Sequence, residues 1–155
     1  MGEQWATNEI NAKGGIHGRK IELVIRDPQG DPTKAVNATQ EVISRFKVHA
    51  IWGPTNSGEL LATTPIMARA KVPSLVAGVV NSLIDPVKFP NAFRVTPANS
   101  QWAEAVRNYA LKRVKERKGA LFGHSTGYGS AARAAYVHGL PQAGGAGVST
   151  GVTYP

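Results

Sequence analysis

Residues 51–59 read IWGPTNSGE, a short apolar strand that passes through a Gly/Pro turn directly into the start of a helix. α/β proteins hold small anions at such junctions, because the free N–H groups of the first helical turn and the positive end of the helix dipole face one point. The hydroxyl of Ser57 adds a further donor. Helix capping is the competing interpretation, since Asn56 and Glu59 have the spacing of a capping box and Ser57 is a common N-cap residue. The junction predicts a strand-turn-helix unit and leaves its role as a ligand site open.

Along the rest of the chain the apolar pattern alternates between strand and helix. A first helix is expected to end at Lys13-Gly14-Gly15, where glycine supplies the left-handed position after the last turn. Strands are predicted at residues 20–26, 48–52, 73–77, 92–95, 120–122 and 148–154, and helices at residues 32–46, directly after the junction, at 100–117 and at 129–138. This alternation indicates an α/β fold, in which a mostly parallel sheet is flanked by helices through right-handed crossovers. Ligands bind beyond the carboxyl ends of such strands, so the junction and residues 77–81 are the expected places.

Several of these elements carry expectations about burial. Residues 20–26 alternate apolar and polar side chains, as on a sheet edge, whereas residues 48–52 suggest a more buried strand. Asp31 is expected to cap the helix at 32–46, with Pro32 as its first residue. That helix is predicted to bury Ala35, Thr39, Val42 and Phe46. The helix after the junction is predicted to bury Leu60, Leu61, Thr64 and Met67, with a kink or break at Pro65, and the helix at 100–117 to bury Ala103, Val106, Ala110 and Val114.

Composition fits a globular domain with a real core, since 42% of the 155 residues are hydrophobic and 18% are charged. The sequence has no run of eighteen apolar residues, and its N-terminus lacks the features of a signal peptide. With no cysteine, disulfides, thiolate zinc sites and a cysteine nucleophile are excluded. Asp27 and Asp31 faintly resemble a calcium loop, but the other ligands are missing, and turn chemistry and capping account for both. No metal site and no cofactor are expected.

The net charge of +8 raises the question of a nucleic-acid partner. The densest basic run, KRVKERK at residues 112–118, ends a predicted helix, where cations favour the negative end of the dipole. No aromatic residues interleave the run to stack on bases. We therefore interpret it as a solvated helix face and expect no nucleic-acid partner.

An enzyme using Ser57 as a nucleophile would need a base beside it. The four histidines, His17, His49, His124 and His138, are scattered without a motif that places one there, and His124 is the best of them because it follows a strand. The junction also lacks the lysine of a phosphate-binding loop. The residues alone therefore give little support to an enzyme.

A family resemblance sharpens this interpretation. Residues 9–23, EINAKGGIHGRKIEL, followed by Asp27 and Asp31-Pro32, resemble the start of a type I periplasmic binding protein of the branched-chain amino-acid class. The likeness continues through Gly53-Pro54, Ser57-Gly58, Pro65-Ile66, Lys71-Val72-Pro73, Asp85-Pro86, Phe93-Arg94-Val95 and Tyr128-Gly129 to Thr153-Tyr154-Pro155. It implies two Rossmann-like lobes that close over an amino acid or similar small solute and deliver it to an ABC permease. It also implies a periplasmic or extracytoplasmic location.

The resemblance assigns candidate ligand contacts residue by residue. Ser57, with the neighbouring N–H groups at Gly58, matches the family position that holds the ligand α-carboxylate. Gly78 and Val79 match the backbone segment that receives the ammonium group. Tyr128 matches the aromatic residue that the second lobe folds over the ligand.

Val80 departs from the family pattern. It stands where branched-chain binders commonly have a threonine that contacts the ligand. Either a polar contact is lost or the ligand differs.

The resemblance also implies that the fold is incomplete. It begins inside the first helix, so the family's first strand, which lies between strands two and three, is expected to be absent. Residues 1–117 are then the N-terminal lobe without its first strand, and residues 118–155 are the start of the second lobe. We expect such a fragment to bind its ligand weakly or not at all. The alternative is a ligand-sensing or self-associating interaction domain, in which copies associate through exposed strand edges.

Overall fold

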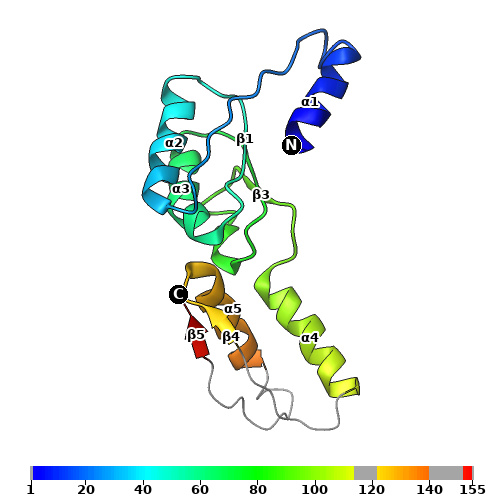
Figure 1. Ribbon diagram of the computed structural model, residues 1–155, viewed down its shortest axis with the longest axis vertical. Coiled ribbons are helices and arrows are strands. Elements are labelled where there is room, and N and C mark those ends of the chain that lie inside the picture. The colour runs from blue at the N-terminus through cyan, green and yellow to red at the C-terminus, as the bar shows by residue number, and fades with distance from the viewer. Residues whose placement is uncertain (1, 114–121, 140–151, 155) are drawn as a thin grey trace.

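The chain forms an α/β structure with two parallel sheets, as the sequence predicts (Figure 1). The computed structural model describes residues 2–113, 122–139 and 152–154. The larger sheet has the order β1 (Ile51–Trp52), β2 (Ser74–Val76), β3 (Ala92–Arg94), and the smaller sheet pairs β4 (Phe122–His124) with β5 (Val152–Tyr154). Each pairing is parallel, which confirms the predicted crossover architecture.

Helices connect these strands close to the predicted positions. They are α1 (Gly2–Ala12), α2 (Pro32–Ser44), α3 (Ser57–Arg69), the short 3₁₀ helix η1 (Asn81–Leu83), α4 (Asn99–Arg113) and α5 (Gly127–Gly139). Gly14 and Gly15 follow α1 with positive φ angles of 99° and 78°, as expected for its end. α3 continues through Pro65 without splitting. α2 packs against α3, and α4 packs against α5 (Figure 1), while α3 and α5 also touch each other.

The core lies where α3 meets the larger sheet. It consists of Leu60, Met67, Val76, Val80 and Leu83, each at most 7% exposed. These residues come from α3, β2, the loop that follows β2, and η1. The predicted inward face of α3 is therefore largely correct, and it fixes the helix that begins at the junction.

The start of α2 is also as predicted. The Asp31 side chain accepts hydrogen bonds from the N–H groups of Thr33 and Lys34 (2.7 and 3.1 Å), and Pro32 opens the helix. Ala35 and Thr39 are buried and Val42 is half-buried.

Three residues predicted to be buried are exposed instead. Phe46 is 39% exposed because α2 ends at Ser44, before this position. Leu61 is 41% exposed and points towards α5. Its Cδ1 lies 3.5 Å from the place where a Cβ atom on Gly127 would be. Val106 is 49% exposed, which nothing in the structure explains. Val114, residues 120–121 and residues 148–151 lie outside the described part of the chain.

The predicted strand at residues 20–26 does not form, and this expectation was wrong. The segment has no ladder partner among the described residues. Within the described residues, the backbone of this segment makes hydrogen bonds at two places. The N–H and C=O of Ile21 pair with the Asn11 side-chain amide (2.7 and 2.9 Å), and the Ile25 carbonyl accepts from the Arg26 guanidinium. A strand needs a neighbour to complete its hydrogen bonds, so an apolar alternating pattern alone was insufficient.

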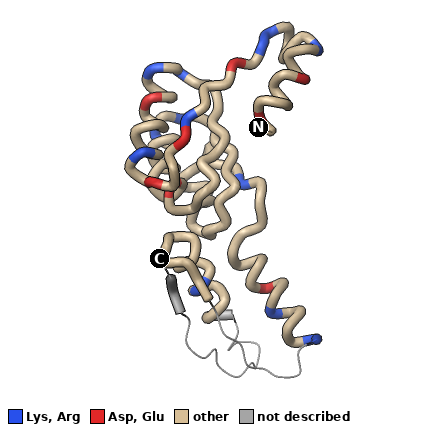
Figure 2. The backbone as a smooth tube through the Cα atoms, in the orientation of Figure 1, with Lys and Arg blue, Asp and Glu red and all other residues tan. Residues whose placement is uncertain are grey.

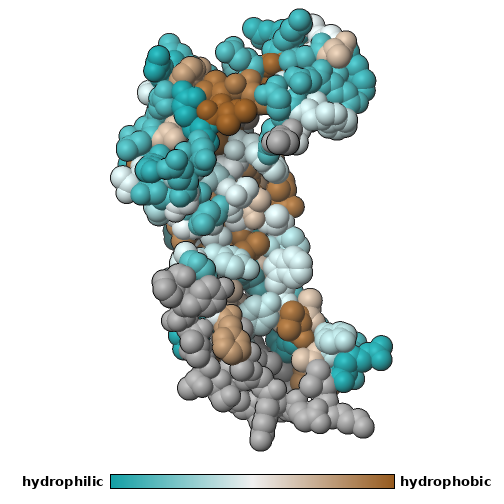
Figure 3. All heavy atoms as spheres, in the orientation of Figure 1, coloured by the Kyte–Doolittle hydropathy of each residue, from teal (hydrophilic) through white to brown (hydrophobic). Residues whose placement is uncertain are grey.

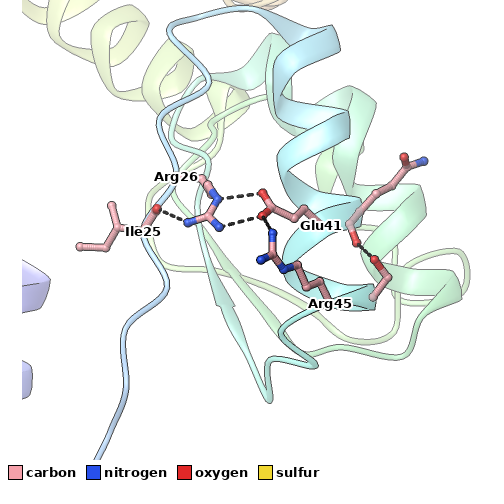
Figure 4. Close-up of polar contacts among 6 residues, drawn as sticks. Ile25, Arg26, Glu41 and Arg45 are labelled. Carbon is pink, nitrogen blue, oxygen red and sulfur yellow. Dashed lines mark hydrogen bonds and ion pairs between the residues drawn. The ribbon is translucent and has the colours of Figure 1, made fainter.

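Side chains hold this unpaired segment to α2 (Figure 4). The Arg26 guanidinium donates two hydrogen bonds of 2.8 Å to the Glu41 carboxylate and a third of 2.9 Å to the Ile25 carbonyl. Arg45 lies 3.5 Å from the same carboxylate, and both guanidinium groups lie over the Phe46 ring. The hydrogen bonds from Arg26 hold the pKa of Glu41 below its ordinary value. The segment is thus tethered at Arg26 and not by a ladder.

β1 was predicted to be a buried strand, but it is an exposed edge. Trp52, Leu75 and Phe93 lie side by side across the sheet and are 50%, 42% and 55% exposed. α1 stands apart from the other helices in Figure 1 and reaches this face through a contact between Glu3 and the Trp52 side chain. Figure 3 shows hydrophobic surface exposed between α1 and the body of the molecule. This face of the sheet lacks the helical cover that a doubly wound sheet normally has.

Candidate ligand-binding site

A cavity of about 390 Å³ opens beyond the carboxyl ends of β1, β2 and β4, within the size range of small-molecule sites. The residues after β1 and β2 form one side, and the residues at and after the end of β4 form the other. Its lining residues are Thr55, Asn56, Ser57, Ala77, Gly78, Val79, His124, Thr126 and Tyr128. The position follows the rule for parallel sheets, in which strands deliver their following loops to one edge.

At the junction, the cap and the candidate ligand contact are different residues. Asn56 is the N-cap of α3, with its Oδ1 accepting from the Gly58 N–H at 2.8 Å. Ser57 is 3% exposed and lines the cavity, yet its hydroxyl makes no hydrogen bond within the described residues. Because Asn56 satisfies the helix start, the Ser57 hydroxyl remains available to a ligand.

Glu59 does not close the capping box that its spacing suggested. Its carboxylate faces the N–H of Gly30, and within the described structure it has no bond to Asn56. The side chain is 3% exposed and its Oε1 has no partner. Burial raises the pKa of Glu59, the nearby Asp27 and Asp31 raise it further, and the Gly30 N–H opposes them. Burial thus favours the neutral acid near the start of α3.

Close packing explains the glycine at the end of β2. A Cβ on Gly78 would lie 2.5 Å from Leu60 Cδ1 and 2.7 Å from Leu83 Cδ1, so a larger residue would displace the core. The carbonyls on either side are occupied, since Thr96 donates to Ala77 and Asn99 donates to Val79 (2.9 and 2.7 Å). Among the hydrogen bonds of the described chain, the Gly78 carbonyl accepts none.

Residues around the start of α5 form the opposite wall. The Thr126 N–H donates to His124 Nδ1 at 3.3 Å. Tyr128 lines the cavity and is half exposed. Gly127 lies against the start of α3: a Cβ atom added at this glycine would be 3.6 Å from the Gly58 Cα. The first turns of α3 and α5 therefore meet at the cavity.

The structure brings four of the six predicted contact residues to the cavity: Ser57, Gly78, Val79 and Tyr128. Gly58 lies beside it, and its N–H is used by the Asn56 cap.

Val80 lies elsewhere. Its side chain packs in the core, 7% exposed, and its carbonyl accepts from the Arg94 guanidinium at 2.9 Å. The Val80 side chain thus faces the core and is not among the residues that line the cavity.

Thr55, Asn56 and Ala77 lie within the two regions where a ligand was expected, although they were not named as contacts. Sequence reasoning missed Thr126 altogether, and it considered His124 only as a base. The carboxyl-end rule for strands could have found them, had it been applied to β4 as well as to the first two strands of the larger sheet.

Other classes of site have little support. In the described ranges no three His, Asp or Glu side chains are placed to hold a metal ion. Asp27 accepts from the Gln29 N–H at 2.8 Å, and Asp31 caps α2, so turn chemistry and capping account for both, as expected. Figure 2 shows the described lysines and arginines spread over several elements and not gathered on one face. No helix that the structure describes is long and apolar enough to cross a membrane.

Comparison with known proteins identifies the lineage. A family model described as "Periplasmic binding protein" matches residues 1–155. The chain belongs to this family. The Leu/Ile/Val-binding protein BraC3 of Rhizobium johnstonii is 30% identical over 131 residues, which are 83% of this chain and 35% of BraC3. The chain therefore spans about a third of the length of that curated relative.

Solved structures of the family share the fold. A type 1 periplasmic binding protein from Bordetella pertussis matches 97% of this chain and 42% of its own, with a TM-score of 0.85 and 26% identity. The solute-binding protein of an ABC transporter from Rhodopseudomonas palustris, in complex with 3,4-dihydroxybenzoic acid, matches 99% of this chain and 43% of its own, with a TM-score of 0.82 and 25% identity. Both matches confirm the predicted α/β lobe, of which this chain contains a part. Members of the family are non-enzymatic, in agreement with the sequence interpretation.

Proposed function

We propose that the chain is a substrate-binding component, or a part of one, of an ABC transporter for amino acids of the branched-chain type or similar small carboxylates. The observation that carries this proposal is the buried Ser57 hydroxyl, which has no protein partner in the described residues and lines a cavity at the start of α3. A helix N-terminus with an adjacent hydroxyl suits a carboxylate. An extracytoplasmic location and a permease partner belong to the same proposal and rest on the family.

In this proposal the ligand lies between two lobes, residues 1–117 and residues 118–155. The separate sheets β1-β2-β3 and β4-β5 support this division. Ser57 holds the carboxylate, the Gly78 carbonyl and the Val79 backbone receive the other end, and Tyr128 covers the ligand. Because the chain spans less than half of its relatives, it supplies only part of the cavity wall, and we expect weak binding.

Ligand titration monitored by NMR tests the proposal, since it detects millimolar affinity. L-leucine, L-valine and related carboxylates are added to the whole chain and to Ser57→Ala. Loss of a hydrogen bond to a charged group should weaken binding about tenfold. Ser82→Ala, at an exposed serine in η1, is the matched control and should bind like the original chain.

Two outcomes contradict parts of the proposal. Equal binding by Ser57→Ala and the original chain would remove Ser57 from the site. Submicromolar affinity for any amino acid would overturn the expectation of weak binding.

A second candidate function is self-association through the edge of β1. The N–H groups of Ile51 and Gly53 donate to the carbonyls of Pro73 and Leu75. The N–H and C=O of Trp52 therefore face the open side, where no described residue pairs with them. Unpaired edges beside exposed apolar side chains template strand addition by another copy. Light scattering after size exclusion tests this: concentration-dependent dimers that Trp52→Lys abolishes would support it, and a monomer at every concentration would refute it.

A further inference from the structure

Two extended segments of the chain lead to the same place but do not pair with each other. Residues 20–26 continue into the turn whose Gly30 N–H faces the Glu59 carboxylate, and β1 continues through the junction into the same first turn of α3. Because both carboxyl ends point to the start of α3, the two segments run in roughly the same direction. Neighbouring parallel strands share a ladder of hydrogen bonds, and the described residues form none between these two. They resemble two strands of one parallel sheet that are not direct neighbours.

Each of the two segments has an unpaired edge. In β1, the N–H and C=O of Trp52 face away from β2 and have no partner in the described part of the chain. In the other segment, the same holds for every backbone N–H and C=O from Glu22 to Val24. Open edges of this kind template the addition of a strand. One strand lying between the two segments would pair with both edges at once.

The side chains that flank this place are apolar. Arg26 points to α2, where it binds Glu41, whereas Ile25 points the opposite way and is 66% exposed (Figure 4). Trp52 is 50% exposed on the face of the larger sheet that lacks helical cover. The opposite face of that sheet meets the core that α3 completes. Since side chains alternate between the two faces, a strand placed here meets apolar surroundings on both and should be apolar throughout.

A strand that already belongs to a folded sheet is the wrong partner for this place. An outer strand, such as β1 or β3, is bonded to its own sheet on one side and can pair on the other side only. Pairing with two edges requires a free extended segment of about five residues, the usual length of a strand. The net charge of +8 favours a segment with acidic ends.

We propose that the chain binds a separate extended peptide, with an apolar core between acidic ends, as a strand paired to both residues 20–26 and β1. The strand is parallel to β1, so its carboxyl end lies beside Gly30. Main-chain hydrogen bonds provide the affinity and the apolar side chains the selection. This activity is separate from solute binding, because neither segment contributes a residue to the lining of the cavity.

Backbone-methylated peptides test the double pairing on the whole chain. The probe has the core Val-Ile-Val-Ile-Val, two aspartates at each end and a terminal dye, and fluorescence anisotropy measures its binding. Alternate residues of a strand direct their N–H and C=O groups to opposite sides. N-methyl groups at the odd core positions therefore block one edge, and those at the even positions block the other. We expect each methylated peptide to bind at least about tenfold more weakly than the probe.

Protein variants and spin labels test the position of the peptide. Ile25→Asp places a charge beside the proposed strand and should weaken binding about tenfold. Val87→Asp adds the same charge at a residue that is 89% exposed elsewhere, and it should bind like the original chain. Circular dichroism verifies that both variants are folded. A nitroxide at the carboxyl end of the probe should broaden the NMR signal of the Gly30 amide, and one at the amino end that of Ile21.

The possible results separate this inference from the other proposals. Weaker binding by only one of the two methylated peptides would show addition to a single edge, which overturns the inference in favour of association through the edge of β1. The absence of saturable probe binding, or equal binding by Ile25→Asp and the original chain, would overturn it too. A reversed nitroxide pattern would contradict the parallel orientation. Solute titrations are unaffected by any of these results, so the proposed function is decided separately.

Discussion

The two faces of the larger sheet differ sharply. On one face Ser74, Val76 and Ala92 are at most 8% exposed, covered by the core that α3 completes. On the other face Trp52, Leu75 and Phe93 are about half exposed. Neighbouring residues of one strand thus differ completely in burial, because side chains alternate between the faces. A doubly wound sheet normally has helices on both faces. Among the described residues, helices cover one face of this sheet and leave the other face exposed.

This difference explains why the cavity is well formed although the sheet is not complete. The walls formed by Ser57 and Gly78 depend on α3 and β2, which pack on the covered face. The bare face contributes none of the lining residues named above. We therefore expect substitutions on the covered face to affect both folding and the site, and those on the bare face to affect mainly association.

The sharpest comparison uses one leucine from each face. Leu60→Ala removes a fully buried side chain and should lower the free energy of unfolding by about 2–5 kcal/mol. Leu75→Ala, at a residue that is 42% exposed, should cost less than about 1 kcal/mol. Urea denaturation measures both. Equal losses would show that the bare face is covered in solution.

Gly78→Ala tests the close contact between β2 and α3. The added methyl group would lie 2.5 Å from Leu60 Cδ1, so overpacking should destabilise the fold by about 1–3 kcal/mol. Gly2→Ala, where the methyl group would meet nothing within 4 Å, is the control. Thermal unfolding distinguishes them, and a neutral Gly78→Ala would mean that the core relaxes around it.

Asn56→Ala tests the cap that frees Ser57 for a ligand. Loss of the bond to the Gly58 N–H should cost about 1 kcal/mol. It should also turn the Ser57 hydroxyl towards the helix start and weaken carboxylate binding. Asn37→Ala, at an exposed position within α2, should be neutral or slightly stabilising. Urea denaturation measures the loss of stability, and ligand titration measures the change in carboxylate binding.

Glu59→Gln should have the smallest effect, visible as a change in pH dependence. Because burial raises the pKa of Glu59, the folded state binds its proton more tightly than the unfolded state does. The stability that this provides is present below the ordinary pKa of 4.5 and is lost as pH rises through the raised value. Glu59→Gln should therefore be more stable than the original chain at neutral pH, with a flatter profile. Glu22→Gln, at an exposed position, should leave the profile unchanged.

Local chemistry made much of the fold predictable from sequence. Asp31 and Pro32 mark the start of α2, and Gly14 marks the end of α1, because caps and turns depend on neighbouring residues. The family resemblance led to Ser57 and Tyr128, which both line the cavity.

Burial was harder to predict because it depends on partners far along the chain. Residues 20–26 have a strand pattern but no ladder partner among the described residues. Trp52 is apolar yet remains 50% exposed, although Glu3 of α1 contacts it. Thr126 reaches the cavity only because α5 packs against the start of α3, a contact that no local pattern encodes.

The contact between Gly58 and Gly127 has a consequence for the timing of binding. A Cβ added at Gly127 would lie 3.6 Å from the Gly58 Cα, an ordinary van der Waals contact, so the two helix starts leave room for little more than a methyl group between them. A bulkier residue at Gly127 would act as a wedge and shift the population towards open forms. Entry would then become faster and the residence time of a bound solute shorter, because opening would no longer limit exchange. If the chain binds a solute as proposed, the size of the residue at Gly127 is expected to affect how long that solute stays bound.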